Sequence, residues 1–241
     1  EINEAEVPIK ILRYGLAPNS GGAGKHRGGL ATEMRFQAQA PNTKVTARNR
    51  DRTRFRSWGV LAGSAGTNSV FLLNPGSNHE VNLGNTDILT IGPGDVLHVA
   101  AGGSGGWGDP LERDPEAVVR DIKSGFVTPD KAEAVYGVIL RNGSYDVDGT
   151  KSLRAARMAE HKRNDAFFDF GPERQEFEHV WTNDNYAVLS DLISELPVHW
   201  RFFMKHRMFE AVANDPDGGS IHDHFTKIVK EYPEISHGLG L

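Results

Sequence analysis

Five glycines stand within the seven residues from Gly102 to Gly108, and no other feature of the chain limits its fold as strongly. Glycine lacks a Cβ atom, so its backbone can adopt positive φ or approach another surface closely, at a cost in conformational entropy. A second glycine cluster, SGGAGKHRGG, occupies residues 20–29. We expect the Gly102–Gly108 loop to face another polypeptide segment or a shared active-site cavity. The alternative is that both loops are tight turns at strand ends.

The first loop also satisfies a nucleotide-binding pattern without the context that the pattern needs. Gly103, Gly105 and Gly108 fit G-x-G-x-x-G, but in a dinucleotide fold the third glycine already lies in the helix that receives the pyrophosphate. Here Pro110 follows Gly108 closely, and a helical pattern begins only near Pro115. The sequence therefore argues against an NAD or FAD site.

The second loop resembles the end of a Walker A motif only in part. Gly24 and Lys25 are followed by His26, where the motif needs a Ser or Thr hydroxyl to bind magnesium. We therefore expect no complete phosphate-binding loop in this chain.

The composition of the chain changes near residue 110. Of its 27 glycines, 18 fall within residues 1–110, and this region shows the two-residue alternation of β-strands. The sequence predicts an α+β fold with a glycine-rich, β-rich region at 1–110 and a helical region at 111–241. Both regions are expected to form one assembly unit within a longer subunit. The expected strands are 9–14, 33–37, 44–47, 69–73, 88–91 and 96–99, and the expected helices are 115–123, 128–136, 152–161, 173–181, 186–196 and 197–213.

Composition excludes several classes of protein. A formal net charge of −5 argues against general nucleic-acid binding. The absence of cysteine excludes a disulfide framework and a thiol nucleophile. No apolar run approaches the ~20 residues of a membrane span. We expect a cytoplasmic protein with no membrane or nucleic-acid partner.

The glycine loops carry the first candidates for chemistry. Lys25 and Arg27 flank His26, whose imidazole can act as an acid or a base near neutral pH. Asp109, at the end of the other loop, could orient a partner or bind a cation. The alternatives are a solvated basic turn at 25–27 and a local turn bond from Asp109. His26 and Asp109 are the catalytic candidates, and Lys25 and Arg27 are candidate substrate contacts.

Arginines alternate along one short segment, at positions 48, 50, 52, 54 and 56. In an extended strand they would lie on one face, where guanidinium groups bind phosphate or carboxylate. A break near Asp51 would divide this row. We expect contacts with anions, either protein carboxylates or a nucleotide, and Arg52 and Arg54 are candidate substrate contacts.

Near the end of the chain, the residues His222-Asp223-His224 resemble part of a metal site. These residues would need a further ligand from elsewhere, and the polar segment after Asn214 is expected to be loose. We assign no metal ligand to this chain.

Four segments together resemble the C-terminal half of hydantoinase B/oxoprolinase subunits. They are SGGAGKHRGGL at 20–30, DRTRFRSWG at 51–59, the run Gly102–Pro115 and FDFGP at 168–172. The resemblance extends from about Glu4 to about Phe209. Members often carry prolines where this chain has Arg56-Ser57, and the subunits of the family are much longer, with metal-binding His/Asp motifs in the half that is absent here.

The resemblance implies a large hetero-oligomer. Its partners would be the N-terminal half of the same family subunit and a hydantoinase A-like ATP-binding subunit, with a small-molecule substrate. ATP would phosphorylate a cyclic amide or a ketone-derived enolate, and water or bicarbonate would complete the reaction. We expect ATP-dependent hydrolysis of a cyclic amide, and ketone carboxylation is the alternative. ATP and a divalent metal are expected to bind outside this chain.

Both reactions need an anionic oxygen to be stabilised, a task suited to backbone N–H groups and cations. This adds Gly102, Gly103, Gly105 and Gly106 to the candidate substrate contacts. A hypothesis of a different class is that the chain is a non-catalytic scaffold, whose glycine loops serve close packing between subunits.

Overall fold

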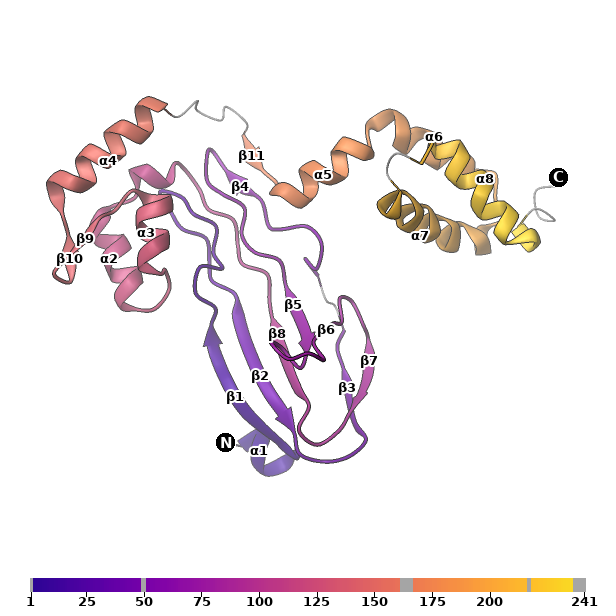
Figure 1. Cartoon of the computed structure of the whole chain (residues 1–241), viewed down its shortest axis with the longest axis horizontal. Coiled ribbons are helices and arrows are strands. Elements are labelled where there is room, and N and C mark those ends of the chain that lie inside the picture. Colours follow the sequence, from indigo (N-terminus) through magenta and orange to yellow (C-terminus); the bar gives the residue numbers. More distant parts are fainter. Residues whose placement is uncertain (1, 49–50, 161–166, 216–217, 236–241) are drawn as a thin grey trace. The chain divides into compact units, whose positions relative to one another are not determined.

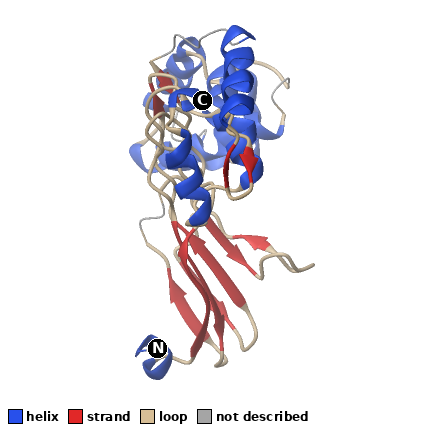
Figure 2. Cartoon of the chain, turned by 90° about the vertical axis from the view of Figure 1, so that its left-hand side faces the viewer, coloured by secondary structure: helices blue, strands red, loops and turns tan. Residues whose placement is uncertain are grey.

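The fold is α+β, with antiparallel strands in the first half of the chain and helices in the second, as the sequence predicts (Figures 1 and 2). The computed structural model describes residues 2–48, 51–160, 167–215 and 218–235. Two compact units are present, residues 1–174 and 175–241. The composition change at residue 110 therefore lies inside the first unit, and its use as a domain boundary stays a prediction.

A five-stranded antiparallel sheet in the order β1-β2-β8-β5-β6 is the main element of the first unit. Its strands are β1 (Ile9–Leu16), β2 (Thr32–Ala38), β8 (Val96–Ala100), β5 (Val70–Leu73) and β6 (Val81–Asn82). A separate pair joins β3 (Thr43–Thr46) to β7 (Ile88–Ile91). Phe36, Phe71 and Leu97 bury their side chains on one face of the main sheet, together with Ile91 of β7. The alternation in the sequence thus predicted these strands except β6, and the structure adds the face that they bury.

The remaining elements of the first unit are short. They are α1 (Ile2–Glu6), β4 (Gly59–Val60), the 3-10 turn η1 (Pro110–Glu112), α2 (Pro115–Lys123), α3 (Pro129–Tyr136), β9 (Leu140–Arg141), β10 (Ser144–Tyr145), α4 (Val147–Glu160) and β11 (Phe168–Asp169). Helix α2 begins as the sequence predicts, because the Asp114 carboxylate accepts a hydrogen bond from the Glu116 backbone N–H. Helix α3 ends at Gly137, whose φ of 61° is left-handed.

Three glycine-containing segments, 20–29, 57–67 and 102–108, lie side by side between the sheet and helices α2 and α3 (Figure 1). We call them the glycine network. Backbone hydrogen bonds join every pair of segments. The Gly22 N–H donates to the Ser104 carbonyl at 2.8 Å, the Ser64 N–H donates to the Ala23 carbonyl at 2.7 Å, and the Gly106 N–H donates to the Ser64 carbonyl at 2.9 Å.

Most of these glycines are required because another backbone segment lies too close for a Cβ atom, and not because their φ is positive. A Cβ atom on Gly103 or on Gly105 would lie 1.8 Å from the carbonyl oxygen of Ser20 or Trp58, respectively. A Cβ atom on Gly22 would lie 2.1 Å from the Ser64 carbonyl oxygen. Atoms cannot approach so closely, so no side chain fits at these positions. The expectation that the Gly102–Gly108 loop faces another polypeptide segment is met within the chain itself.

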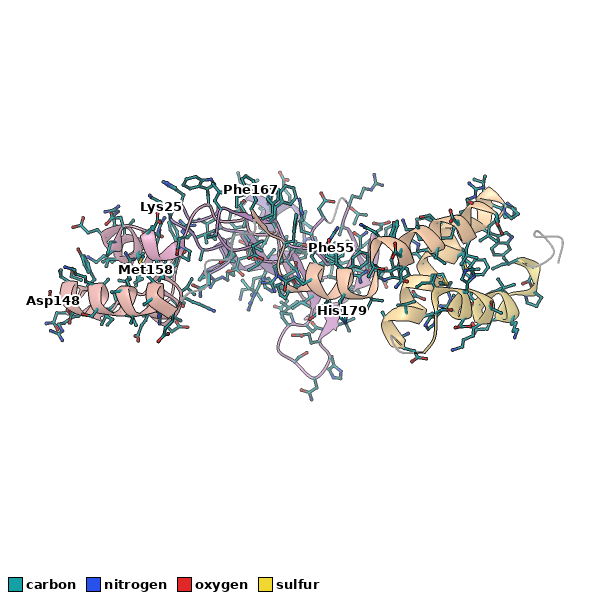
Figure 3. The ribbon with its side chains drawn as sticks, turned by 90° about the horizontal axis from the view of Figure 1, so that it is seen from above. Lys25, Phe55, Asp148, Met158, Phe167 and His179 are labelled. Carbon is teal, nitrogen blue, oxygen red and sulfur yellow. The ribbon has the colours of Figure 1, made fainter. Side chains whose placement is uncertain are left out.

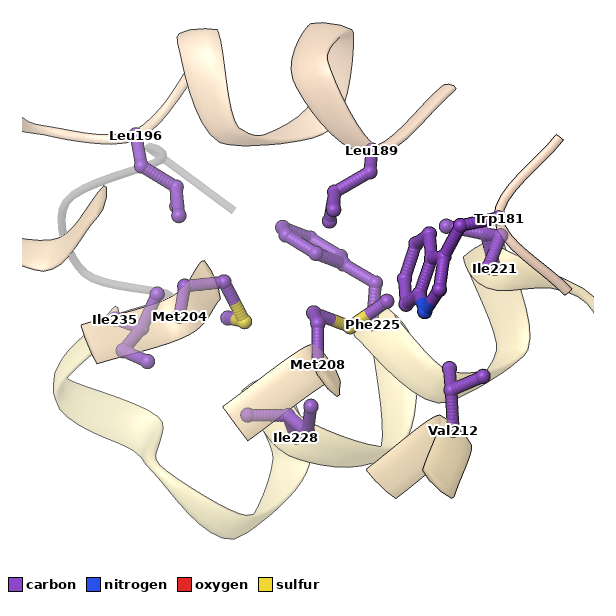
Figure 4. Close-up of a cluster of buried hydrophobic side chains, with 10 residues drawn as sticks. All are labelled: Trp181, Leu189, Leu196, Met204, Met208, Val212, Ile221, Phe225, Ile228 and Ile235. Carbon is purple, nitrogen blue, oxygen red and sulfur yellow. The ribbon is translucent and has the colours of Figure 1, made fainter. Parts of the chain in front are cut away.

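The second unit is helical. It contains most of α5 (Pro172–Val180), then α6 (Asn183–Ser194), α7 (Val198–Asn214) and α8 (Ile221–Glu231). Figure 4 shows its core, to which Trp181, Leu189, Met208 and Phe225 contribute buried side chains. No helix in the described part of the chain combines the length and apolar composition that a membrane crossing requires.

Helix α8 corrects the expectation of a loose segment after Asn214. Ser220 and Asp223 form a capping box, in which the Ser220 hydroxyl accepts from the Asp223 N–H and the Asp223 carboxylate accepts from the Ser220 N–H. His224 and Phe225 are buried one turn further on. The polar residues of this segment therefore mark the start of a helix, and Asp223 is a capping residue.

We predict that Gly105→Val lowers the free energy of unfolding by about 3 kcal/mol or more. Overpacking costs about 1–3 kcal/mol where side chains can move, but the clash here is with the Trp58 carbonyl oxygen. Gly15→Ala is the control, because a Cβ atom on Gly15 in β1 meets nothing within 4 Å. Urea unfolding measures both variants, and equal stabilities would contradict the close packing described above.

In the second unit, Met208→Ala should cost about 2–5 kcal/mol, the usual range for truncating a fully buried Met or Leu. Met208 is 0% exposed. Phe202→Ala lies on the same helix, where Phe202 is 75% exposed, and should change stability by no more than about 0.5 kcal/mol. Thermal unfolding of the two variants compares them directly. A larger loss for Phe202→Ala would show that α7 buries its other face.

Candidate functional site

The basic loop at residues 25–27 is held against the end of the glycine network. The Lys25 N–H donates to the Gly108 carbonyl at 3.1 Å, and His26 and Trp107 exchange two backbone hydrogen bonds, each 2.9 Å. The His26 ring lies 5.4 Å from the Trp107 ring, and Lys25 Nζ lies 3.2 Å from a carboxylate oxygen of Glu112. Lys25 and His26 are both exposed, and Figure 3 shows the Lys25 side chain at the surface.

Arg27 is the member of this loop whose charge is used inside the fold. Its guanidinium donates to both carboxylate oxygens of Asp121 in α2, at 3.1 and 3.3 Å. Arg113 donates to the same carboxylate at 2.9 Å. Asp121 is only 8% exposed, and a buried carboxylate needs such partners. Arg27 thus ties the loop to helix α2, and its contact with a substrate stays a prediction.

Asp109 makes the local turn bond that we weighed as the alternative. Its carboxylate accepts a hydrogen bond from the Leu111 backbone N–H at 2.8 Å and caps η1. His26 and Asp109 therefore have different neighbours, Trp107 and Leu111. No hydrogen bond joins these two side chains, so the structure does not assemble them into an acid–base pair.

The row of arginines does not form a single face. Arg52 has a φ of 59°, which breaks the extended chain next to Asp51, and Arg50 lies outside the described residues. Arg52 donates to the Arg56 carbonyl at 3.2 Å and lies over the Trp58 ring, 5.2 Å from its centroid. Arg54 lies 5.2 Å over the Phe55 ring.

Arg56 has a protein carboxylate as its partner. Its Nε and Nη2 atoms donate to one oxygen of Glu173 at 2.9 and 2.6 Å. These hydrogen bonds lower the pKa of the Glu173 carboxyl group below its usual value. The pair joins the residue next to the 57–67 segment of the glycine network to the start of helix α5, within the first unit.

Two cavities border the glycine network. The first, about 420 Å³, brings together Arg52 and Gly102, two of the predicted substrate contacts, and Arg48 also lines it. The second, about 270 Å³, lies between the network and helix α3 and is lined by Gly22, Thr67, Arg56, Lys131 and Tyr136, among others. We call it the α3 cavity. Burial raises the pKa of the Tyr136 hydroxyl, which therefore stays protonated at neutral pH.

The network uses some of the N–H groups that we expected to bind an oxyanion. The Gly103 N–H donates to the Thr67 carbonyl at 3.1 Å, and the Gly106 N–H donates to the Ser64 carbonyl.

The sequence gave no reason to connect Lys131 or Tyr136 with the loops, because both belong to an ordinary helix pattern. Among the described residues, no group of three or more His, Asp or Glu side chains could hold a metal ion.

Comparison with known proteins agrees with the resemblance. The model of the hydantoinase B/oxoprolinase family matches residues 1–110. The β subunit of a caprolactamase from Pseudomonas jessenii is 35% identical, over 65% of this chain and 28% of its own length. The acetone carboxylase α subunit of Xanthobacter autotrophicus is 28% identical, over 64% of this chain and 25% of its own.

A solved structure of the ATP-dependent caprolactamase from Pseudomonas jessenii is also similar. It is 28% identical over 63% of this chain and 27% of its own, with a TM-score of 0.49. The chain thus spans between a quarter and a third of the length of these relatives. The match to the family model and these relatives agree that this chain is similar to members of the hydantoinase B/oxoprolinase family.

Proposed function

We propose that the chain is part of an ATP-dependent enzyme that hydrolyses a cyclic amide and works only as a complex. The supporting observation is its identity of 35% to the caprolactamase β subunit, against 28% to the acetone carboxylase α subunit over a similar share of the chain. The proposed partners are the N-terminal half of the family subunit and a hydantoinase A-like ATP-binding subunit. ATP and a divalent metal would bind outside this chain.

The chemistry explains why such an enzyme would use ATP. An amide carbonyl is a poor electrophile, because its nitrogen shares its electron pair with the carbonyl group. Transfer of a phosphoryl group from ATP to the amide oxygen would activate the carbon toward water. The ring C–N bond would then break and leave an amino acid, ADP and phosphate. Negative charge develops on oxygen during these steps, and nearby cations would stabilise it.

Within this chain, the α3 cavity is the place that we propose for such a contribution. The backbone of the glycine network is held rigidly on one side by the contacts described above, and helix α3 presents Lys131 on the other. Arg56 is neutralised by Glu173 at 2.6 Å, which leaves Lys131 as the cation of this cavity that forms no ion pair with a carboxylate among the described residues. We propose that Lys131 contacts the developing oxyanion.

The second candidate function is carboxylation of a ketone, which the similarity to the acetone carboxylase α subunit favours. There, the anionic oxygen would belong to an enolate, and bicarbonate would take the place of water. A non-catalytic scaffold is the third candidate. It is compatible with a glycine network that packs entirely within the chain.

The test of the reaction is a complex assembled from this chain, the rest of the family subunit and a hydantoinase A-like subunit. We expect ATP hydrolysis that depends on a lactam such as caprolactam or 5-oxoproline, with one ring-opened amino acid formed. This chain alone should hydrolyse no ATP. Turnover of acetone with bicarbonate, and none of the lactams, would instead establish the carboxylase.

The test of the α3 cavity is Lys131→Met in the same complex. We expect kcat to fall by at least about tenfold, since removing one oxyanion contact costs about 10²–10³ in well-studied enzymes. Lys151→Met, on the exposed side of α4, removes the same charge and should leave kcat unchanged. If both variants keep full activity while the complex stays intact, the chain acts as a scaffold.

A further inference from the structure

The main sheet has a polar face opposite its core, and charged side chains gather there. Phe36 and Leu97 point to the core, so their neighbours Arg35 and His98 lie on the other face. Arg35 pairs directly with Arg13 of β1 and with His98 of β8. The register of β1 shifts between Ile11 and Arg13, and this bulge brings Arg13 to the polar face.

A buried carboxylate stands at the centre of this face. Glu33 is 5% exposed, its side chain pairs with Arg13, and His98 Nε2 lies 3.1 Å from its second oxygen. Burial acts to raise the pKa of Glu33, but the hydrogen bonds from Arg13 and His98 outweigh burial and lower it. Glu33 is therefore ionised at neutral pH, and the positive charge of Arg13 compensates it.

Two further titratable groups at this face, His98 and Asp95, also have lowered pKa values. Burial lowers the pKa of His98, and the positive charge of Arg35 adds to this effect, so His98 is neutral near pH 7. The Asp95 carboxylate accepts hydrogen bonds from the Gly92 N–H at 2.9 Å and from Asn74 Nδ2 at 3.0 Å. These bonds lower its pKa. Both carboxylates are thus already engaged.

Arg35 is the exception. In the described part of the chain no carboxylate pairs with its guanidinium, and its Nε atom is buried without a hydrogen-bond acceptor. Arg35 lines a cavity of about 670 Å³ on the polar face, together with Arg13, His79, Leu12 and Val96. Asp95 also lines this cavity, but its two oxygens accept the hydrogen bonds from Gly92 and Asn74, and it forms no ion pair with Arg35. Arg35 therefore borders a cavity that is large enough for a small molecule without an ion-pair partner of its own.

We propose that this cavity binds the oxyanion group, carboxylate or phosphate, of a small molecule, with Arg35 as its principal contact. A guanidinium fork binds both groups through two parallel hydrogen bonds. Asn74 lines the same cavity, and its amide nitrogen has a second hydrogen besides the one donated to Asp95, while Leu12 and Val96 would contact an apolar part of the ligand. The site is separate from the glycine network and does not depend on the proposed reaction.

The test is titration of the full-length chain with two probes, inorganic phosphate and glutarate, followed by NMR shifts of backbone amides at constant ionic strength. We expect saturable shifts centred on Leu12, Arg35 and Val96, and the probe that binds more tightly identifies the source of the oxyanion. Arg35→Gln should weaken binding at least tenfold. Arg120→Gln removes the same charge from an exposed position on α2 and should bind as the wild type does.

A third variant keeps the proposal testable if Arg35→Gln fails to fold. Arg35→Lys retains the charge and loses the fork, so we expect weaker binding with an unchanged thermal midpoint. Shifts that persist in both Arg35 variants, or that spread equally over the other exposed arginines, would overturn the proposal. Binding of polyglutamate with no binding of either small ion would also overturn it, because the face would then be a docking surface for an acidic polypeptide.

Discussion

Backbone packing without side chains is the constraint on which the first unit depends. The three segments of the glycine network approach so closely that a Cβ atom on Gly103 or Gly105 would lie 1.8 Å from a carbonyl oxygen. The ends of strands β2, β5 and β8 lead into these segments, and helix α2 is tied to them through Arg27 and Asp121. The sheet, the helices and both neighbouring cavities therefore take their positions from main-chain contacts.

More of the arginine side chains form ion pairs within the fold than the sequence suggests. Arg27 and Arg113 share Asp121, Arg56 pairs with Glu173, and Arg13 pairs with Glu33. Buried or half-buried pairs of this kind contribute little net stability, but leaving one partner alone is costly. A basic loop whose sequence suggests substrate binding can thus use its cations to hold parts of the fold together. Lys131 and Arg35 form no ion pair with a carboxylate in the described part of the chain and line cavities, and they are the cations that we propose to meet ligands.

The sequence predicted most of the longer strands and helices, but it did not bring together the residues that share a cavity. The alternation at 96–99 and the cap at Asp114 predicted β8 and α2, because both signals depend on neighbouring residues alone. The capping box at Ser220 was misread as a loose segment, since its helix is polar on one face. Lys131 could not be connected with Gly22, because the cavity that they share joins residues far apart in the chain.

The bulge in β1 decides to which face of the sheet the side chains on either side of it point. Ile11 pairs with Phe36 and Arg13 with Arg35, so Leu12 is one residue more than regular pairing needs. Deletion of that residue would make Ile11 and Arg13 neighbours, and neighbours in a regular strand point to opposite faces, so both side chains would keep their present faces. A strand that kept Leu12 but paired regularly would instead turn over at one end. Either the guanidinium that neutralises Glu33 would then point into the apolar core, or Ile9 and Ile11 would face water.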